Sequence, residues 1–584
     1  MKARKAESRR GGAAAAVLHK GRAPAAGRHR LPYAAAAFGA VVAVFVVYRP
    51  SLHGAFQFDD TTLPFSTAFN APFLAWVAGL RPILMATYWM NVRLSGDDPY
   101  SYHLVNLLFH AIAGGLIFLV VRRLLEWSVV RQSRRNLLAG FAALLFLLHP
   151  VQTEAVAYVA GRSECLSAML VFAAFTVFLY RRAPAASWGV VAGVLVLFGA
   201  ALLSKEHTVA LVGLLLLTDF WWNPGFSLKG IRDNWKLYLP VALGAAAGVF
   251  RFRDLLTHAA TAGFGMKDFT WYQYFFTQCR ALFVYIFQFL LPVNLTADWE
   301  FPISKTIFDH GAIVGLAALL ALAGLAWHYR RRFPLAGYGF FVYLVLMAPT
   351  SSILPIKDPV AERRLYFSML GLLLILVDFL DRAIPDRKQL TAVCGVVVLA
   401  AAIATYVRAG VWADPVALWT DTVAKAPSNR RAHFQLAYAL WTSGRPDLAV
   451  PEFQRTSQLG SVTPDLLMDW GLAYDSLHQP EEALAKFRQS ASLEPTAAAY
   501  VNIAKVYAER YQWTEALDAL DTAQKIESNN ANVYSYRGKI YLKTNRVPAA
   551  IQEYRHALAI DPGFEDARHD LDIAQKMLRA AAKP

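Results

Sequence analysis

A series of apolar segments between residues 31 and 408 most constrains the fold of this chain. Hydrophobic types make up 56% of the residues and charged types 17%, against about 25% charged residues in ordinary soluble proteins. Only a helix or a closed barrel satisfies the backbone inside a bilayer, so the pattern predicts an all-α, polytopic membrane bundle of about 11–12 helices. The segments are 31–48, 103–121, 136–149, 164–180, 187–203, 207–222, 237–250, 275–291, 311–327, 338–353, 364–381 and 390–408.

The basic residues between the segments predict which side of the membrane each gap faces, because short loops rich in Lys and Arg stay in the cytoplasm. Residues 1–30 carry nine Lys or Arg and one acid. We therefore expect a basic cytoplasmic tail, in contact with membrane lipid, ahead of a membrane domain at 31–408. The less basic gaps are then external, at 49–102, 150–163, 204–206, 292–310 and 354–363.

The number of crossings depends on two apolar runs, 237–250 and 275–291. Eleven helices cross if one of the runs does not span the membrane, and the chain after residue 408 then lies outside. Twelve cross if both runs do, but two basic gaps then face outward, against the usual bias. The charge pattern therefore favours eleven crossings.

After a linker at 409–426, the apolar runs stop and a repeat begins in residues 427–584. The repeat places a small residue every 33 or 34 positions, at Ala437, Gly471, Ala504 and Gly538. This period is typical of tetratricopeptide repeats, and it predicts about four helix pairs followed by a capping helix. Such arrays bind peptides or proteins on a concave face, so we expect a protein partner; a scaffold that stabilises only its own domain is the alternative.

Composition also excludes some classes of function. The net charge is +16, but the basic residues lie in short gaps between apolar runs and do not form the basic face of a nucleic-acid-binding domain. Cys165, Cys279 and Cys394 each lie in or beside an apolar run. Their spacing excludes a disulfide framework, a CxxC motif and a zinc site, and predicts three buried thiols.

Asp59 and Asp60 are adjacent carboxylates in the first external gap, flanked by aromatic residues. Two like charges this close raise the pKa of at least one carboxyl, which suits a general base. Asp60 is the preferred base because it lies further from the end of the preceding helix. The alternative interpretation is an ordinary acidic turn.

Further ionisable residues lie in or beside the external gaps. Charged groups near membrane depth are costly, and each is a functional candidate by default. Acids and cations on one side of a membrane would suit a phosphate-linked substrate, although structural ion pairs between helices are the alternative. His103 and His149 are expected to form hydrogen bonds at helix ends. The ionisable candidates are Arg81, Arg162, Lys205, Arg363, Arg364, Glu154, Glu164, Glu206 and Glu362.

Four motifs occur in a fixed order before the repeats: FQFDD at 56–60, HPVQTEAVAYVAGRSE at 149–164, LLSKEH at 202–207 and AERRLYFSMLG at 361–371. This ordered set resembles the transmembrane and tetratricopeptide-repeat O-mannosyltransferases and their bacterial relatives, within the GT-C superfamily of glycosyltransferases. The resemblance implies a GT-C-like fold in a bacterial inner membrane. It also implies a cytoplasmic N-terminus and repeats on the periplasmic side.

The resemblance further implies transfer of a sugar from a polyprenyl-phosphate donor to a Ser or Thr hydroxyl of a protein acceptor. The acidic pair would lie at the catalytic centre, and Arg81, Lys205 and Arg363 would bind the phosphate, ahead of Arg162 and Arg364. The four glutamates would orient these cations or bind sugar hydroxyls. No cofactor is expected, and a divalent metal at the acidic pair is the less favoured alternative. A membrane-anchored repeat scaffold and a lipid-linked glycan ligase or polymerase remain alternative functions.

Overall fold

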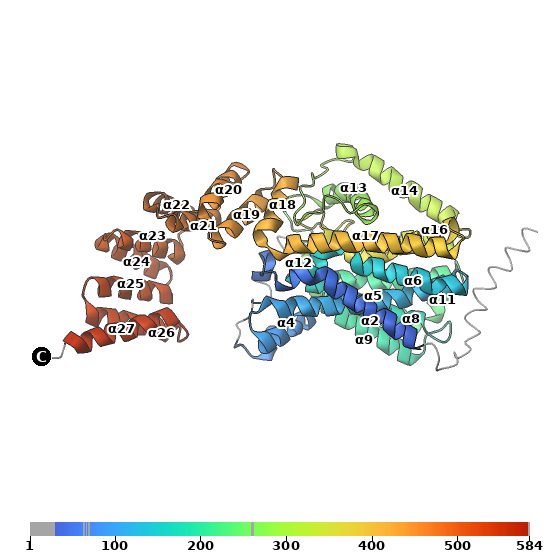
Figure 1. The fold of residues 1–584 in the computed structure, drawn as a ribbon, viewed down its shortest axis with the longest axis horizontal. Helices are drawn as coiled ribbons and strands as arrows, with labels where there is room; N and C mark the ends of the chain where they lie inside the picture. The colour runs from blue at the N-terminus through green and yellow to red at the C-terminus, as the bar shows by residue number, and fades with distance from the viewer. Residues whose placement is uncertain (1–29, 62–64, 66, 68–69, 259–261, 582–584) are drawn as a thin grey trace, which may run out of the picture. The chain divides into compact units, whose positions relative to one another are not determined.

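The computed structural model describes residues 30–61, 65, 67, 70–258 and 262–581, so the predicted basic tail lies outside the described residues except for Arg30. The chain forms two compact units, Met1–Lys425 and Ala426–Pro584. Within the described ranges every regular element is a helix, apart from one isolated bridge between Ala262 and Ile356 (Figure 1). The predicted all-α class, with apolar helices followed by tetratricopeptide repeats, is confirmed.

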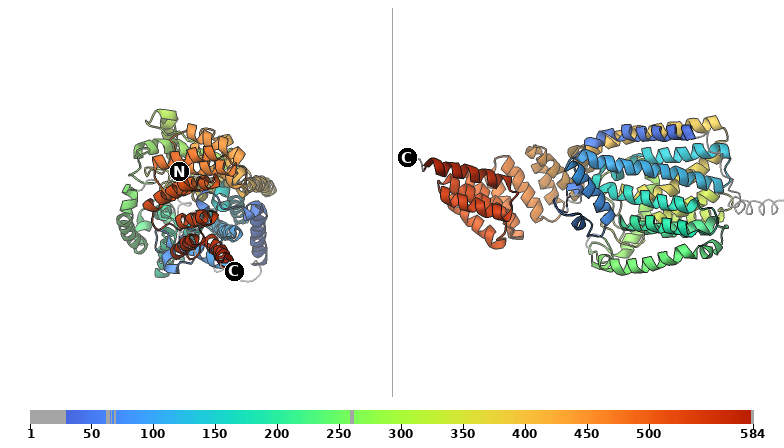
Figure 2. Two further views of the ribbon diagram at one scale, coloured as in Figure 1. Left: turned by 90° about the vertical axis from the view of Figure 1, so that its left-hand side faces the viewer. Right: turned by 90° about the horizontal axis from the view of Figure 1, so that it is seen from below.

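The first unit is a bundle whose long helices run alongside one another (Figure 2). Short 3-10 turns connect or precede many of them: η1 (Arg49–His53), η2 (Phe58–Thr61), η3 (Pro150–Gln152), η4 (Val159–Gly161), η5 (Glu206–Val209), η6 (Asp309–Gly311) and η7 (Glu362–Arg364). The α-helices are α2 (Arg30–Tyr48), α3 (Phe73–Trp76), α4 (Pro82–Ser95), α5 (Pro99–Trp127), α6 (Gln132–Leu148), α7 (Thr153–Ala157), α8 (Arg162–Leu179), α9 (Trp188–Leu202), α10 (Ala210–Trp222), α11 (Lys229–Asp233), α12 (Trp235–His258), α13 (Trp271–Leu290), α14 (Ala312–His328), α15 (Pro334–Met347), α16 (Leu365–Ala383), α17 (Arg387–Ala413) and α18 (Pro415–Lys425).

Several helices of this unit are long and apolar enough to cross a membrane, which makes the chain an integral membrane protein. Among the described residues there are five, at Tyr33–His53, Pro99–Trp127, Val159–Leu179, Asp309–His328 and Arg387–Ala413. A sixth results if Gln132–Leu148 and Pro150–Ala157, bent by 49°, are one span. Both uncertain runs are helical, as α12 and α13, and the count of eleven crossings stays a prediction.

Burial separates the inner helices of the bundle from the outer ones. In the apolar window of Val159–Leu179, 72% of the residues are buried, against 17% for Arg387–Ala413 and 11% for Asp309–His328. Helix α8 is therefore central, while α14 and α17 present apolar side chains outward. An apolar outer surface is what a hydrocarbon environment requires.

Close backbone contact joins α15 and α16 in this core. A Cβ atom added at Gly371 would overlap the backbone of Tyr343, and one added at Gly339 would overlap the carbonyl oxygen of Gly371. Two glycines facing each other therefore let the helices approach more closely than larger residues would allow. Small residues serve the same purpose at many membrane helix interfaces.

Up to residue 581, the second unit consists of four antiparallel helix pairs and one further helix. Small residues at the repeat positions make room for aromatic rings of the paired helix: Gly471 lies against Phe487, and Gly538 against Tyr554. This contact explains why the sequence period is visible. The helices are α19 (Arg430–Thr442), α20 (Pro446–Gln458), α21 (Pro464–Ser476), α22 (Pro480–Leu493), α23 (Ala497–Glu509), α24 (Trp513–Ile526), α25 (Ala531–Lys543), α26 (Val547–Ile560) and α27 (Glu565–Ala581).

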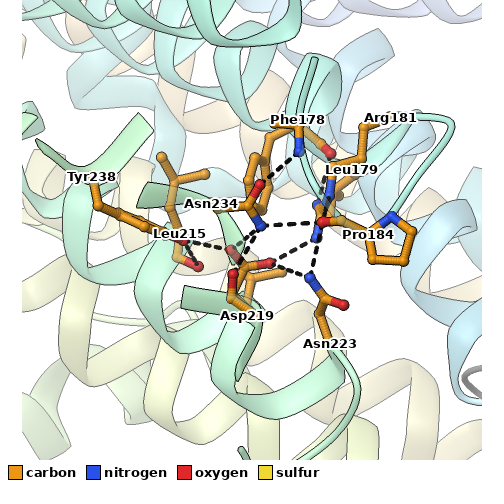
Figure 3. Close-up of polar contacts among 12 residues, drawn as sticks. Phe178, Leu179, Arg181, Pro184, Leu215, Asp219, Asn223, Asn234 and Tyr238 are labelled. Carbon is orange, nitrogen blue, oxygen red and sulfur yellow. Dashed lines mark hydrogen bonds and ion pairs between the residues drawn. The ribbon is translucent and has the colours of Figure 1, made fainter. Parts of the chain in front are cut away.

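A buried polar cluster ties together α10, α12 and the loop that follows α8 (Figure 3). We call it the Asp219 cluster; it consists of Arg181, Asp219, Asn223, Asn234 and Tyr238. Arg181 Nη2 lies 2.7 Å from Asp219 Oδ1, and the two side chains are 1% and 0% exposed. The other oxygen, Oδ2, accepts hydrogen bonds of 2.8 Å from Asn234 and from Tyr238. The pair is therefore fully desolvated and supported by neutral donors.

Candidate active site

Residues from all five predicted external gaps contact one another in the first unit. The sequence assigned these gaps to one side of the membrane from their low content of basic residues, and the structure brings them into one polar layer. The contacts that join the gaps are Asp60 with Ala160, Arg81 with Glu206, Ser163 with Lys205, Glu154 with Arg363, and Thr296 with Glu362.

Asp60 links the first external gap to the second through hydrogen bonds. Its side chain is 1% exposed, and its carboxylate accepts hydrogen bonds from the backbone N–H groups of Ala160 at 2.6 Å and of Val159 and Gln57 at 3.3 Å. Burial raises the pKa of the Asp60 carboxyl to about 8, because desolvation outweighs the three backbone donors that favour the charged form. Both oxygens of this carboxylate are therefore used within the protein.

Asp59 differs from its neighbour in that its side chain is exposed. Its backbone N–H donates to the Tyr158 hydroxyl at 2.9 Å. The residue before it, Phe58, has a φ of 51°, a left-handed conformation in which a bulky residue is strained. The turn thus places Asp59 on the surface and Asp60 in the interior.

Arg81 and Glu206 form the first of three cation–carboxylate pairs in the polar layer. Arg81 Nε and Nη2 each donate to one Glu206 oxygen at 2.9 Å, and the side chains are 35% and 30% exposed. Although burial acts to lower the pKa of Arg81, its contact with Glu206 raises that pKa overall. Arg81 therefore stays charged while remaining partly open to solvent.

Lys205 forms the second pair with Glu164, which lies at the beginning of α8. The Nζ–Oε1 distance is 2.5 Å, and the side chains are 17% and 6% exposed. Ser163 Oγ accepts a further hydrogen bond from Lys205 at 3.1 Å. Nε2 of His207 lies 3.5 Å from the other Glu164 oxygen.

Arg363 forms the third pair, with Glu154 of α7. Its backbone N–H donates to Glu154 at 2.7 Å, and its guanidinium also contacts that carboxylate. Nη2 lies 3.6 Å from Asp358, and 31% of the Arg363 side chain is exposed. Burial acts against the charged form, but the two carboxylates raise the pKa of Arg363 above its usual value.

The three cations lie close enough to influence one another. Burial lowers the pKa of Lys205, and the charges of Arg81 and Arg363 lower it further, against the opposing effect of Glu164. Glu164 thus favours the charged form of Lys205 against these effects. The structure brings together the three residues that the sequence singled out as phosphate partners, and it pairs them with three of the four candidate glutamates.

The remaining candidates are buried anchors within the polar layer. Arg162 is 0% exposed; its guanidinium donates to Asn106 at 2.9 Å and lies 4.4 Å from the centre of the Tyr88 ring. Arg364 donates to the Pro359 carbonyl at 2.8 Å. Glu362 accepts from the Thr296 N–H at 2.6 Å, and burial raises the pKa of Glu362 to about 8.

The two candidate histidines also have backbone partners. His103 Nε2 lies 3.1 Å from the Gly54 carbonyl oxygen, and His149 Nε2 lies 3.0 Å from that of Phe289. All three cysteines are free and buried, as expected from the sequence.

Sequence reasoning did not single out Tyr158, Gln57 or Trp412. Tyr158 supplies the hydroxyl that binds the Asp59 backbone, and Gln57 Nε2 donates to the Trp412 carbonyl at 2.6 Å. Both Gln57 and Tyr158 lie inside motifs that the sequence did single out. Trp412 lies 355 positions from Gln57, and no local pattern points to a contact across that separation.

A metal at the acidic pair fits these side chains poorly. In the part of the chain that the structure describes, no group of three or more His, Cys, Asp or Glu is arranged to hold a metal ion. Both Asp60 oxygens already accept backbone hydrogen bonds. A cation there would have to share those oxygens with the backbone donors that hold the turn.

The raised pKa of Asp60 predicts a pH-dependent stability. The folded state keeps the proton up to about pH 8, while the unfolded state loses it near the ordinary value of 3.8. The free energy of unfolding should therefore fall as pH rises from about 4 to about 8, by at most about 1.4 kcal/mol per pH unit for this group. Chemical unfolding in detergent across this range should show a smaller slope for Asp60→Asn than for wild type.

A second buried acid and an exposed aspartate provide the controls for this experiment. Glu362 has a similarly raised pKa, so the slope should shrink and not vanish. Asp97→Asn, which changes an exposed aspartate of the same external gap, should leave the slope unchanged. Equal slopes for wild type and Asp60→Asn would mean that Asp60 is already ionised in the folded protein at low pH.

Comparison with known proteins shows which families this chain resembles in sequence. A family model described as a tetratricopeptide repeat matches residues 401–460, 468–532 and 512–563. The human protein O-mannosyl-transferase TMTC3 is 24% identical over 92% of this chain, and the mouse protein is 26% identical over 91%. Human protein O-mannosyl-transferase TMTC1 is 26% identical over 65% of the chain. The chain spans 65% and 64% of the length of the two TMTC3 proteins.

Proposed function

We propose that this chain, which is homologous over most of its length to the TMTC-type protein O-mannosyltransferases, is a membrane glycosyltransferase. It transfers a sugar, mannose by analogy with these relatives, from a polyprenyl-phosphate donor to a hydroxyl of a protein acceptor at the periplasmic face. The observation that carries the proposal is the polar layer. This layer contains an exposed aspartate, Asp59, and three cations that are each held by a carboxylate.

The chemistry requires a base and a stabilised leaving group. Asp59 accepts the proton of a Ser or Thr hydroxyl as the hydroxyl oxygen forms a bond to the anomeric carbon. The bond between that carbon and the phosphate oxygen breaks, and the polyprenyl phosphate departs with the electron pair. Charge that develops on this phosphate is stabilised by cations fixed in place before the reaction.

Asp59 suits the role of base better than Asp60, which the sequence had favoured. A general base must reach the proton that it removes, and Asp59 is exposed while Asp60 is 1% exposed with both oxygens bonded to backbone N–H groups. In this assignment Asp60 positions the turn. Two adjacent carboxylates thereby take different roles because their surroundings differ.

Arg81 and Arg363 suit the donor phosphate best among the cations, since 35% and 31% of their side chains are exposed. A guanidinium offers five N–H donors, so each arginine can contact a phosphate while it keeps its glutamate. The Lys205 side chain is more buried, with 17% exposed, and contributes its positive charge without being the main contact of the phosphate. The glutamates fix the cations before the donor arrives, and no cofactor is required.

The test is sugar transfer by the purified full chain in detergent, with labelled mannosyl and other glycosyl polyprenyl phosphates and envelope proteins as acceptors. Label on protein, from a polyprenyl-phosphate donor, is the expected result. Label on glycan alone would favour a lipid-linked glycan ligase. No transfer by a folded protein with any donor would overturn the proposal and favour a membrane-anchored repeat scaffold.

A further inference from the structure

The turn that carries the acidic pair is strained. Phe58 has a φ of 51°, and a bulky residue in the left-handed region costs on the order of 1–3 kcal/mol. Such a conformation persists only where surrounding contacts hold it. The contacts around Gln57–Asp60 therefore decide where the Asp59 carboxylate lies.

One set of these contacts comes from the end of α17 and from α18. Gln57 Nε2 donates to the Trp412 carbonyl at 2.6 Å. The Phe58 ring packs edge-on against Trp419, with the ring centres 5.9 Å apart. The two residues that precede Asp59 thus each contact a tryptophan, one in α17 and one in α18.

Tyr158 also holds the turn. Its hydroxyl accepts the Asp59 backbone N–H at 2.9 Å, and its ring lies 5.7 Å from that of Trp412. Asn106 Nδ2 donates to the Tyr158 carbonyl at 3.0 Å, which fixes the tyrosine backbone. Tyr158 is 6% exposed and Trp412 4%, so neither side chain has room to change its rotamer freely.

Further contacts fix α17 and α18, the helices that carry the two tryptophans. Arg408 of α17 pairs with Asp421 of α18 at 2.6 Å, and the Arg408 side chain is 8% exposed. Lys425 at the end of α18 donates to the Leu295 carbonyl at 2.7 Å. The C-terminal half of α18 is therefore tied both to α17 and to the loop that contains Leu295.

We propose that Tyr158, Trp412 and Trp419, together named the Tyr158 clamp, are positioning residues that hold the strained turn and aim Asp59 at the acceptor hydroxyl. This inference rests on the proposed function for its catalytic consequence. It assigns a role to α18, which carries none of the residues that the sequence singled out, and it makes α17 and α18 part of the catalytic apparatus.

Hydrogen exchange of the full chain tests the clamp without any need for sugar transfer. Tyr158→Phe removes the acceptor of the Asp59 N–H, and Trp419→Leu removes the ring beneath Phe58. Both variants should accelerate amide exchange in a peptide covering residues 55–61 by at least about fivefold, since exchange reports local opening. Tyr343→Phe is the control, because it also removes a tyrosine hydroxyl that makes one hydrogen bond to the backbone, here donated to Leu282 at 2.6 Å. Unchanged exchange in Tyr158→Phe and Trp419→Leu would overturn the clamp.

Kinetics separates positioning from general damage to the fold. We expect Tyr158→Phe and Trp419→Leu to lower kcat about 10-fold while the KM for the donor stays within about twofold, because a small misplacement of a reacting group is costly. Tyr343→Phe should leave both constants near wild type. Equal losses in all three variants, or a rise in donor KM that matches the loss in kcat, would overturn the positioning role. If wild type transferred no sugar, the proposed function would fail, and hydrogen exchange would still decide whether the clamp exists.

Discussion

Replacing Asp59 by Asn is expected to lower kcat for sugar transfer at least about 100-fold, which is the lower end of what a general base contributes. The amide keeps the size of the side chain but does not accept the acceptor's proton. Because the exposed Asp59 side chain contributes little to packing, the melting temperature in detergent should change little. The measurement is initial rate against acceptor concentration, with the donor saturating.

Two further variants make this result specific. Asp97→Asn changes an exposed aspartate of the same external gap and should retain wild-type kcat. Asp60→Asn should affect the stability of the turn as well as the rate, since the Asp60 carboxylate binds three backbone N–H groups. If Asp60→Asn abolished transfer while Asp59→Asn left it intact, the roles of the two aspartates would be reversed.

Breaking the Asp219 cluster is expected to have the largest effect on stability. Arg181→Met leaves the Asp219 carboxylate buried without its cation, and Asp219 is 0% exposed. Removing one partner of a buried ion pair costs about 3–5 kcal/mol, because the remaining charge stays desolvated. Chemical unfolding in detergent should show this loss of free energy, and the yield of folded protein should fall.

A surface pair is the matched comparison for this prediction. Lys576 and Asp572 lie 2.5 Å apart with 73% and 56% of their side chains exposed. Breaking this pair with Asp572→Asn should change the free energy of unfolding by less than about 1 kcal/mol, as exposed pairs contribute little. Similar losses in Arg181→Met and Asp572→Asn would show that the desolvation argument does not hold for the cluster.

Much of the architecture was predictable because its signals are local. Small residues recur every 33 or 34 positions, and the two glycines among them each face an aromatic ring of their own repeat, as Gly471 faces Phe487. The distribution of Lys and Arg separated the gaps that meet in the polar layer from the gaps that contribute Arg181, Asn223 and Asn234 to the Asp219 cluster. Both inferences depend on periodicity and composition, which a single sequence contains.

The details of the site were less predictable because they depend on contacts between distant residues. Nothing in two adjacent aspartates indicates that Asp60 is buried and Asp59 exposed, since that difference arises from the Val159–Ala160 backbone about 100 positions away. The pairing of each cation with one glutamate was also unspecified, although each was a candidate. The Tyr158 clamp joins residues separated by more than 250 positions.

The Asp219 cluster also restricts how sequences related to this one can diverge. A protein in which only Arg181 or only Asp219 is substituted folds poorly. Exchanging both for apolar residues of similar volume is often neutral for stability. A lineage can therefore lose the pair only if the second substitution follows the first closely, or if an earlier stabilising substitution compensates for the stability lost in between. We expect the two positions to covary among relatives, each sequence holding both charges or neither.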